Sequence, residues 1–167
     1  LGRSGTVSAA VEAAFFDVPA IAVSLYVPPP APGEDREWHE VATEVADYRE
    51  ATRAATYLAR HAAGAGVFEQ AEYLNVNAPL PADEPAPMAI TRPSTGYDMT
   101  ARRDGDRIRL RDRIWERMRE GDIPDPEGTD RRAIVDGRVS VSPLTAPHTV
   151  HHHESLDGLA ETYLTSV

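Results

Sequence analysis

The chain has 167 residues, of which 41% are hydrophobic, so it is long enough for one domain with a core of its own. It contains no Cys, which excludes disulfides, thiolate zinc sites and Cys nucleophiles. Its 27 acidic and 17 basic residues give a formal net charge of -10, and because an acidic surface repels phosphate backbones we expect no nucleic-acid partner.

A helix is predicted to begin at the turn formed by Ser4, Gly5 and Thr6. Small apolar residues follow this turn as far as Ala14, and either Ser4 or Thr6 can cap the free amides at the helix start. Residues 20–25 are almost wholly apolar, which is typical of a parallel strand covered on both faces. A helix followed by a buried strand is half of a crossover unit, so the predicted fold class is α/β.

A second helix is predicted from residue 38 to residue 59, where apolar residues recur at helical spacing. Gly64 follows it at the position where helices often end. Two further strands are predicted at 73–77 and at 88–92, each a short run of residues with high strand preference.

Asp104 and Gly105 give the strongest hairpin signal, because they lie between two runs in which apolar and polar residues alternate. We expect a protruding hairpin arm over roughly residues 96–118 that serves in dimerisation. Eight Arg residues fall between Arg102 and Arg119, but acidic residues are interleaved with them. We therefore interpret the segment as solvated hairpin faces with cross-strand ion pairs rather than as a nucleic-acid surface.

The remaining elements are a turn at 128–130, a strand at 139–142 ended by Pro143, and a closing helix at 156–164. Asp130 and Asp136 lie in turn contexts, where Asp is favoured for its backbone hydrogen bonds, so we interpret both as structural. The run His151 to His153 is at best an adventitious metal site, because consecutive side chains along an extended chain point in different directions.

Three separated parts of the chain carry distinct motifs that have to be considered together. They are Ser4 to Ala10 leading to 19–25, then 74–79 followed by 90–92, and finally 128–130 followed by Ala133 and 137–144. In order and rough spacing these stretches resemble the SurE family, also called stationary-phase survival proteins. The resemblance identifies residues 1–167 as the carboxyl-terminal part of a single SurE-like domain.

The resemblance implies an incomplete Rossmann-like α/β sheet of three layers, with a protruding β-hairpin and a carboxyl-terminal helix that serve in homodimers or homotetramers. It implies a phosphomonoesterase that hydrolyses nucleoside 5′- and 3′-monophosphates with a divalent metal, Mg²⁺ or Mn²⁺. The family holds this metal with an Asp-Asp pair, a Ser and an Asn that precede the Ser-Gly-Thr turn. None of these ligands is present in the chain, so we assign no catalytic and no metal-binding residue and expect the isolated chain to be inactive.

What the resemblance does carry over is a substrate phosphate-binding role for Ser4, Gly5 and Thr6. A helix start offers unpaired N–H groups and a partial positive charge, which suit a phosphate dianion. Gly5 lets the backbone approach closely, and the two hydroxyls add donors. The alternative is an ordinary helix cap. Asn75 and Asn77 at a strand end are interpreted as structural, with room for a supporting role near the site.

Two interpretations of the function stay open. The chain is either part of a metal-dependent nucleotidase or a non-catalytic remnant that binds phosphate or a partner subunit. It starts at Leu1, without Met, inside a loop-to-helix turn, and we expect an upstream segment that carries the metal site. The chain has no stretch apolar enough to span a bilayer and no signal-peptide pattern, so we expect a cytoplasmic protein without a membrane partner. An acidic chain whose basic residues are all Arg is also typical of salt-loving organisms.

Overall fold

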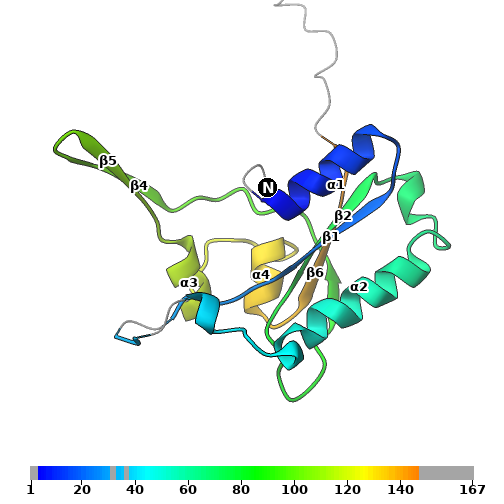
Figure 1. The fold of residues 1–167 in the computed structure, drawn as a ribbon, viewed down its shortest axis with the longest axis horizontal. Coiled ribbons are helices and arrows are strands. Elements are labelled where there is room, and N and C mark those ends of the chain that lie inside the picture. The colour runs from blue at the N-terminus through cyan, green and yellow to red at the C-terminus, as the bar shows by residue number, and fades with distance from the viewer. Residues whose placement is uncertain (1–3, 31–32, 36–37, 147–167) are drawn as a thin grey trace, which may run out of the picture.

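The computed structural model describes residues 4–30, 33–35 and 38–146, which form a four-stranded sheet with helices on both sides and a separate two-stranded arm (Figure 1). The strands of the sheet lie in the order β1, β2, β6, β3. The predicted closing helix at 156–164 and the histidine run at 151–153 lie outside the described residues. In the part of the chain that is described, no helix is long and apolar enough to cross a membrane.

Parallel pairing of the first two strands agrees with the predicted α/β class. β1 (Ala20–Leu25) pairs in parallel with β2 (Tyr73–Ala78), with Ala20 opposite Tyr73 and Leu25 opposite Ala78. β6 (Val139–Leu144) runs antiparallel to β2 on its other side, and β3 (Met88–Ile90) is parallel to β6. The first two strands thus have their carboxyl ends at the same edge of the sheet.

The sheet is the middle of three layers, as predicted. Figure 1 views it nearly edge-on, with α1 (Gly5–Phe15) and α4 (Asp130–Val135) on one side and α2 (Arg49–His61) on the other. Alternate residues of each strand serve the two sides. The core on the α2 side includes Ile21, Val23, Leu74, Val76, Val139 and Val141. The core on the α1 side includes Ala22, Tyr73 and Leu144.

Pro143 does not end the last strand, contrary to the prediction. β6 continues through Pro143 to Leu144, and Pro143 lies opposite Leu74 of β2. The Val139 amide and the Val141 carbonyl form hydrogen bonds on the β3 side, so the nitrogen of Pro143 faces that side as well. β3 has already ended there, and a proline nitrogen without a hydrogen is therefore tolerated.

The predicted helix at 38–59 is wrong in its first part, because the chain forms two 3-10 turns there, Trp38–Glu40 and Val45–Tyr48. α2 begins only at Arg49. Glu44 and Asp47 form a capping box, in which the Glu44 amide donates to the Asp47 carboxylate at 2.9 Å. Such a box starts a new helical segment, so it interrupts the one that the apolar spacing suggests. A further 3-10 turn, Val67–Glu69, follows the helix.

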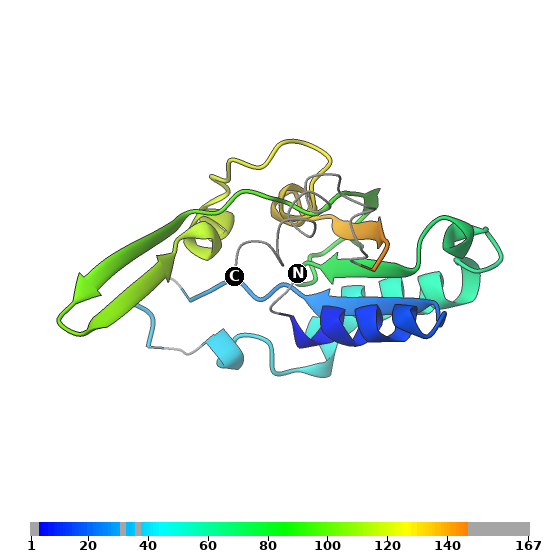
Figure 2. The ribbon, with the colours of Figure 1, turned by 90° about the horizontal axis from the view of Figure 1, so that it is seen from above.

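The structure contains the predicted hairpin, with strands that are shorter than the expected arm of 96–118. These strands are β4 (Met99–Asp104) and β5 (Arg107–Asp112), joined by a tight turn in which Gly105 has a φ of 61°. α3 (Ile114–Glu120) follows directly, and its buried Ile114 and Met118 pack against Ile123 and Ile134. The arm projects away from the sheet in Figures 1 and 2.

Two short helices were not predicted. α3 has 7 residues and α4 has 6, too few turns for a helical period to be visible in the sequence. The predicted turn at 128–130 leads directly into α4. β3 also ends at Ile90 instead of Arg92, and Arg92 makes only an isolated bridge with Thr129.

A buried carboxylate, Glu50, joins α2 to the loop between β2 and β3. It is 1% exposed and accepts hydrogen bonds from Arg53 at 2.6 Å, from Arg49 at 3.2 Å and from the Ala86 amide at 3.2 Å. The same two guanidinium groups donate to the carbonyls of Ala82 and Ala86. Burial raises the pKa of Glu50, but the bonds from Arg53, Arg49 and Ala86 outweigh it, so the pKa lies below its ordinary 4.5.

Replacing Glu50 with Gln is expected to lower the free energy of unfolding at pH 7 by about 2 kcal/mol, because charge-assisted bonds are lost from a buried position. The half-exposed arginines keep this below the cost of breaking a fully buried pair. Urea unfolding measures the difference. Glu12→Gln, at an exposed position of α1, is the control, and its free energy of unfolding should stay within about 0.5 kcal/mol of the value for the unaltered chain.

The same substitution carries a pH dependence. Because the pKa of folded Glu50 is depressed, its stabilisation is present above about pH 4.5 and is lost as the pH falls through the lower folded value. The stability difference between the two chains should therefore shrink below pH 4.5. A difference that stays constant down to pH 3 would contradict this role for the carboxylate.

Candidate phosphate-binding site

The start of α1 leaves backbone donors without an acceptor inside the helix. Ser4 is the cap, with φ -90° and ψ 119°, and its Oγ accepts the amide of Val7 at 3.3 Å. The first helical bond runs from the Ser8 amide to the Ser4 carbonyl, so the amides of Gly5 and Thr6 have no acceptor within the helix. Both residues are exposed. Of the two predicted caps, Ser4 is the one that is used.

Gly5 leaves open space around the helix start. A Cβ placed on Gly5 would meet no atom within 4 Å among the described residues. The structure therefore leaves room for close approach at Gly5, and no packing within the described part of the fold requires a glycine there. A phosphate oxygen can reach the amides of Gly5 and Thr6 there, and the Thr6 and Ser4 hydroxyls add two further donors.

The helix start lies at the carboxyl edge of the sheet. Figure 2 shows α1 running back along β1, with its first turn beside the arrowheads of β1 and β2. In open α/β sheets, ligands bind outside the carboxyl ends of the strands, at just such an edge. Ser4 to Thr6 therefore lie at the edge of the sheet where ligands bind in such folds, and not at the opposite edge.

Polar residues form two rows across the sheet face that α1 covers. Strand register places Asn75 beside Ser142 in one row, and Ser24, Asn77 and Ser140 together in the next row towards the edge. Thr91 Oγ1 lies 2.9 Å from the Ser140 hydroxyl and 2.8 Å from the Ser142 hydroxyl. These three buried hydroxyls satisfy one another, whereas Ser24 and Asn77 are half-buried and stand nearest the carboxyl edge.

Sequence reasoning did not identify these rows, although a signal was present. The alternation in 73–78 and 139–142 places every polar residue on one face and every apolar residue except Tyr73 on the other. Such a pattern predicts a strand with one polar face, even inside a sheet covered on both sides. Asn77 lies in the row nearest the carboxyl edge, and Asn75 lies one row deeper.

Asp130 and Asp136 have structural partners, as interpreted from the sequence. Asp130 accepts the amide and hydroxyl of Ser94 at 2.8 and 2.6 Å, which ties the loop after β3 to the start of α4. Asp136 follows α4 and pairs with Arg132 at 3.6 Å. Arg131 reaches the buried carboxylate of Asp125 at 2.7 Å. These contacts hold α4 and its flanking loops in place.

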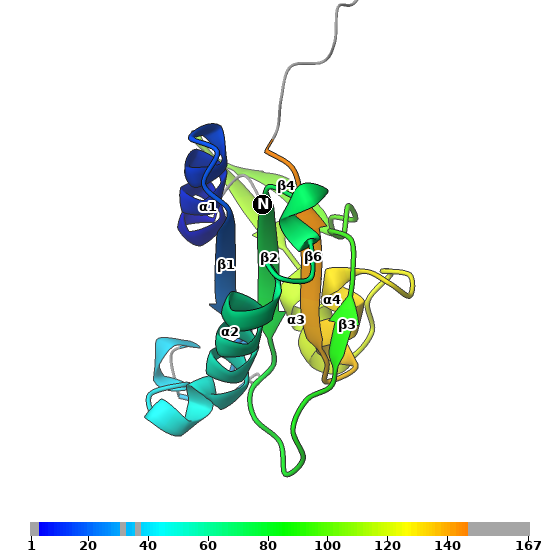
Figure 3. The ribbon, with the colours of Figure 1, turned by 90° about the vertical axis from the view of Figure 1, so that its right-hand side faces the viewer.

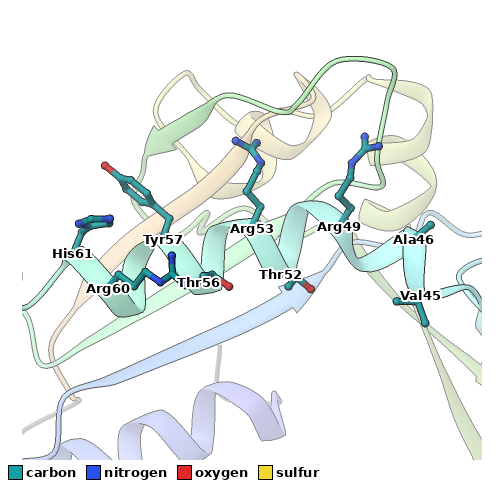
Figure 4. Close-up of a pocket in the computed structure, with 9 residues that line it drawn as sticks. All are labelled: Val45, Ala46, Arg49, Thr52, Arg53, Thr56, Tyr57, Arg60 and His61. Carbon is teal, nitrogen blue, oxygen red and sulfur yellow. The ribbon is translucent and has the colours of Figure 1, made fainter.

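A groove of about 610 Å³ follows the outer side of α2, on the other side of the sheet (Figure 4). Arg49, Arg53 and Arg60 line it, and no acidic residue does. Two of these arginines are engaged by Glu50 and by the carbonyls of the loop beyond β2. The groove therefore does not extend the site at the start of α1.

The described residues do not fit a divalent metal. Across residues 4–30, 33–35 and 38–146, no group of three or more His, Asp or Glu side chains is placed to hold an ion. The Asp-Asp pair, Ser and Asn implied by the resemblance have no counterparts in the chain. We therefore derive no chemical step through a metal from these residues.

The fold is a three-layer α/β domain in which the first helix starts at the carboxyl edge of the parallel strands β1 and β2. The family model described as Survival protein SurE matches residues 1–99. The chain belongs to the SurE survival protein family.

Individual relatives agree with this assignment. The chain is 67% identical to the 5'-nucleotidase SurE of Haloquadratum walsbyi, a match that covers 100% of this chain and 62% of that protein. It is 64% identical to the 5'-nucleotidase SurE of Haloarcula marismortui, over 98% of this chain and 60% of the relative. The chain thus spans about three fifths of the length of these curated relatives.

A solved structure shows the same fold. The crystal structure of the SurE protein from Aquifex aeolicus matches 97% of this chain and 58% of its own chain, with a TM-score of 0.58 and 22% sequence identity. At this identity the match concerns the fold alone, and it agrees with the predicted SurE-like class.

Replacing Ser4 with Ala is expected to lower the free energy of unfolding by about 1 kcal/mol, because the Val7 amide loses its acceptor. Thr6→Ala is the matched control, since Thr6 is exposed and makes no cap; its effect should stay within about 0.5 kcal/mol. Thermal or urea unfolding measures both. Equal losses for the two variants would contradict the assignment of Ser4 as the cap.

Proposed function

We propose that the chain is part of a cytoplasmic phosphomonoesterase that hydrolyses nucleoside 5′- and 3′-monophosphates, and that Ser4, Gly5 and Thr6 bind the substrate phosphate. The observation that carries the proposal is the exposed helix start at the carboxyl edge of the sheet. Support comes from the 67% identity to a relative named 5'-nucleotidase SurE. The family assignment supports nucleoside monophosphates as the substrate class.

The residues at the start of α1 can hold a phosphate dianion without a cationic side chain. The amides of Gly5 and Thr6 donate to two non-bridging oxygens, and the positive end of the helix dipole adds a favourable field. The Ser4 oxygen accepts the Val7 amide, which leaves its own hydrogen free to donate to the ligand. Donors fixed in this way also stabilise the charge that develops on these oxygens during phosphoryl transfer.

The complete enzyme is proposed to require Mg²⁺ or Mn²⁺, held by residues outside this chain. The role of the 167 residues is then to bind and orient the phosphate, and the chain alone does not hydrolyse it. A second candidate is a non-catalytic module that binds phosphate or a partner subunit.

Hydrolysis of nucleoside monophosphates tests the proposal. Phosphate release is measured with Mn²⁺ or Mg²⁺ for this chain and for a version extended to the length of its relatives. We expect release by the extended chain alone. Activity of the short chain would place the metal site within it and contradict our assignment, whereas inactivity of both would favour the non-catalytic module.

In the extended chain, Gly5→Val is expected to lower kcat/KM at least about tenfold, because a side chain there blocks the approach to the amides. Its melting temperature should change little, since a Cβ at this position meets no atom of the described residues within 4 Å. Ala9→Val, on an exposed position of the same helix, is the control and should keep kcat/KM within twofold.

The arm is the second element for which we propose a function, as a contact between subunits of a homodimer or homotetramer. All residues of β4 and all but the last of β5 are exposed, and Ile108 is 72% and Leu110 63% exposed. An isolated two-stranded hairpin is marginally stable in water. Packing against a second copy would bury its apolar side chains and stabilise it.

Replacement of residues 99–112 by a short Gly-Ser linker tests the role of the arm. Mass in solution, measured by light scattering after gel filtration, should fall to that of a monomer or of a smaller oligomer. The double substitution Arg103→Ser and Arg109→Ser, which leaves the apolar positions intact, should not change it. An unchanged mass after removal of the arm would show that the subunits meet elsewhere.

A further inference from the structure

Two aromatic side chains from distant parts of the chain stack at the carboxyl edge of the sheet. Tyr26 directly follows β1, and Trp115 lies in the first turn of α3. Their ring centroids are 6.3 Å apart and their planes are inclined by 15°, an offset stack. Figures 1 and 2 place α3 beyond the carboxyl end of β1, at the same end of the sheet as the start of α1. The pair and the phosphate-binding turn thus share one edge.

The inner half of this pair is held firmly. The Tyr26 amide donates to the Ala78 carbonyl at 2.8 Å, and its ring packs against the apolar cluster around Ile114 and Met118. Arg119 of α3 donates to the Pro30 carbonyl at 2.6 Å, which ties the loop after β1 to the helix. Burial raises the pKa of the Tyr26 phenol, only partly offset by Arg119, so the ring is neutral at physiological pH.

The outer half of the pair is open. Trp115 is 53% exposed although it is the largest kind of apolar side chain. Stacking on Tyr26 fixes the tilt of its indole, and the exposed remainder offers a flat aromatic surface. Interaction sites are enriched in exposed aromatic residues of this kind.

Building on the proposed function, we propose that Trp115, backed by Tyr26, is a stacking surface for the base of the nucleotide whose phosphate binds at Ser4 to Thr6. A base has a π-face whatever its identity, so stacking binds all bases and discriminates weakly among them. Trp115 is thus a specificity-determining residue that favours a nucleotide over a sugar phosphate. Purines, with two fused rings, should bind more tightly than pyrimidines.

Binding to three probes separates the base from the phosphate. Dissociation constants of inorganic phosphate, ribose 5-phosphate and AMP are measured for the 167-residue chain by calorimetry. AMP is expected to bind about tenfold more tightly than ribose 5-phosphate, a ratio within the range of base stacking on an aromatic side chain. Trp115→Ala should remove this ratio and leave phosphate binding within twofold. Trp115→Phe, which keeps a ring, should retain most of it.

Tyr57→Ala is the matched control, because Tyr57 is a similarly exposed aromatic residue on α2, across the sheet from α1. It should leave all three constants unchanged. Equal affinity for AMP and ribose 5-phosphate, or a ratio that survives in Trp115→Ala, would overturn the inference while phosphate binding still supports the site at α1. AMP binding that depends on Trp115 without any phosphate binding would support the stacking surface and refute the phosphate site. Absence of all binding would refute both.

In the extended enzyme the same variant has a kinetic signature. Because stacking of a remote base is equally strong in substrate and transition state, Trp115→Ala should raise the KM for AMP about tenfold and leave kcat within twofold. The KM for ribose 5-phosphate should not change. A fall in kcat with an unchanged KM would show that Trp115 acts on the fold of the active site and not on the base.

Discussion

The constraint on which the structure depends is the two-sided character of β2. Leu74 and Val76 point into the core beneath α2, while Asn75 and Asn77 point to the face that α1 and α4 cover. The same strand therefore presents an apolar face to the α2 layer and a polar face to the layer of α1 and α4. β6 repeats the arrangement with Val139 and Val141 on one face and two serines on the other, and the register aligns the two polar rows. A shift of one residue in this register would turn the asparagines towards the apolar core beneath α2 and the valines towards the polar rows beneath α1 and α4.

Polar side chains on a buried face need hydrogen-bond partners. Among the described residues, some of these side chains form hydrogen bonds with one another and others do not. Thr91, Ser140 and Ser142 form a closed set of hydroxyls deep in the sheet. Ser24 and Asn77 share the edge row with Ser140 but, within the described part of the chain, they take no part in this set and are half-buried. Half-buried polar groups at this edge are accessible from outside the sheet, whereas the closed set of buried hydroxyls is not.

Prediction from the sequence succeeded where the signal is local. The apolar run at 20–25 and the pair Asp104-Gly105 define β1 and the hairpin without reference to the rest of the fold. It failed where tertiary contacts decide. α3 is stabilised as a helix because Ile114 and Met118 pack against Ile134, which is distant in sequence. α2 starts later than predicted because a capping box interrupts the helix that the spacing of apolar residues suggests. Ser4 as a cap follows from residue type alone, but its place at the carboxyl edge needs the sheet.

The aromatic pair shows why part of a site stays invisible in one sequence. Tyr26 and Trp115 each look like an ordinary exposed or half-buried aromatic, and nothing local connects a residue after the first strand to one after the hairpin. Their stacking depends on α3 folding back onto the loop after β1, which the Arg119 contact with Pro30 secures. The hairpin thus has a consequence beyond its own exposed surface: it separates β3 from α3 in sequence and returns the chain to the sheet edge, where Trp115 meets Tyr26. A phosphate at α1 and a base at α3 would then be held by segments whose relative position only the complete sheet determines.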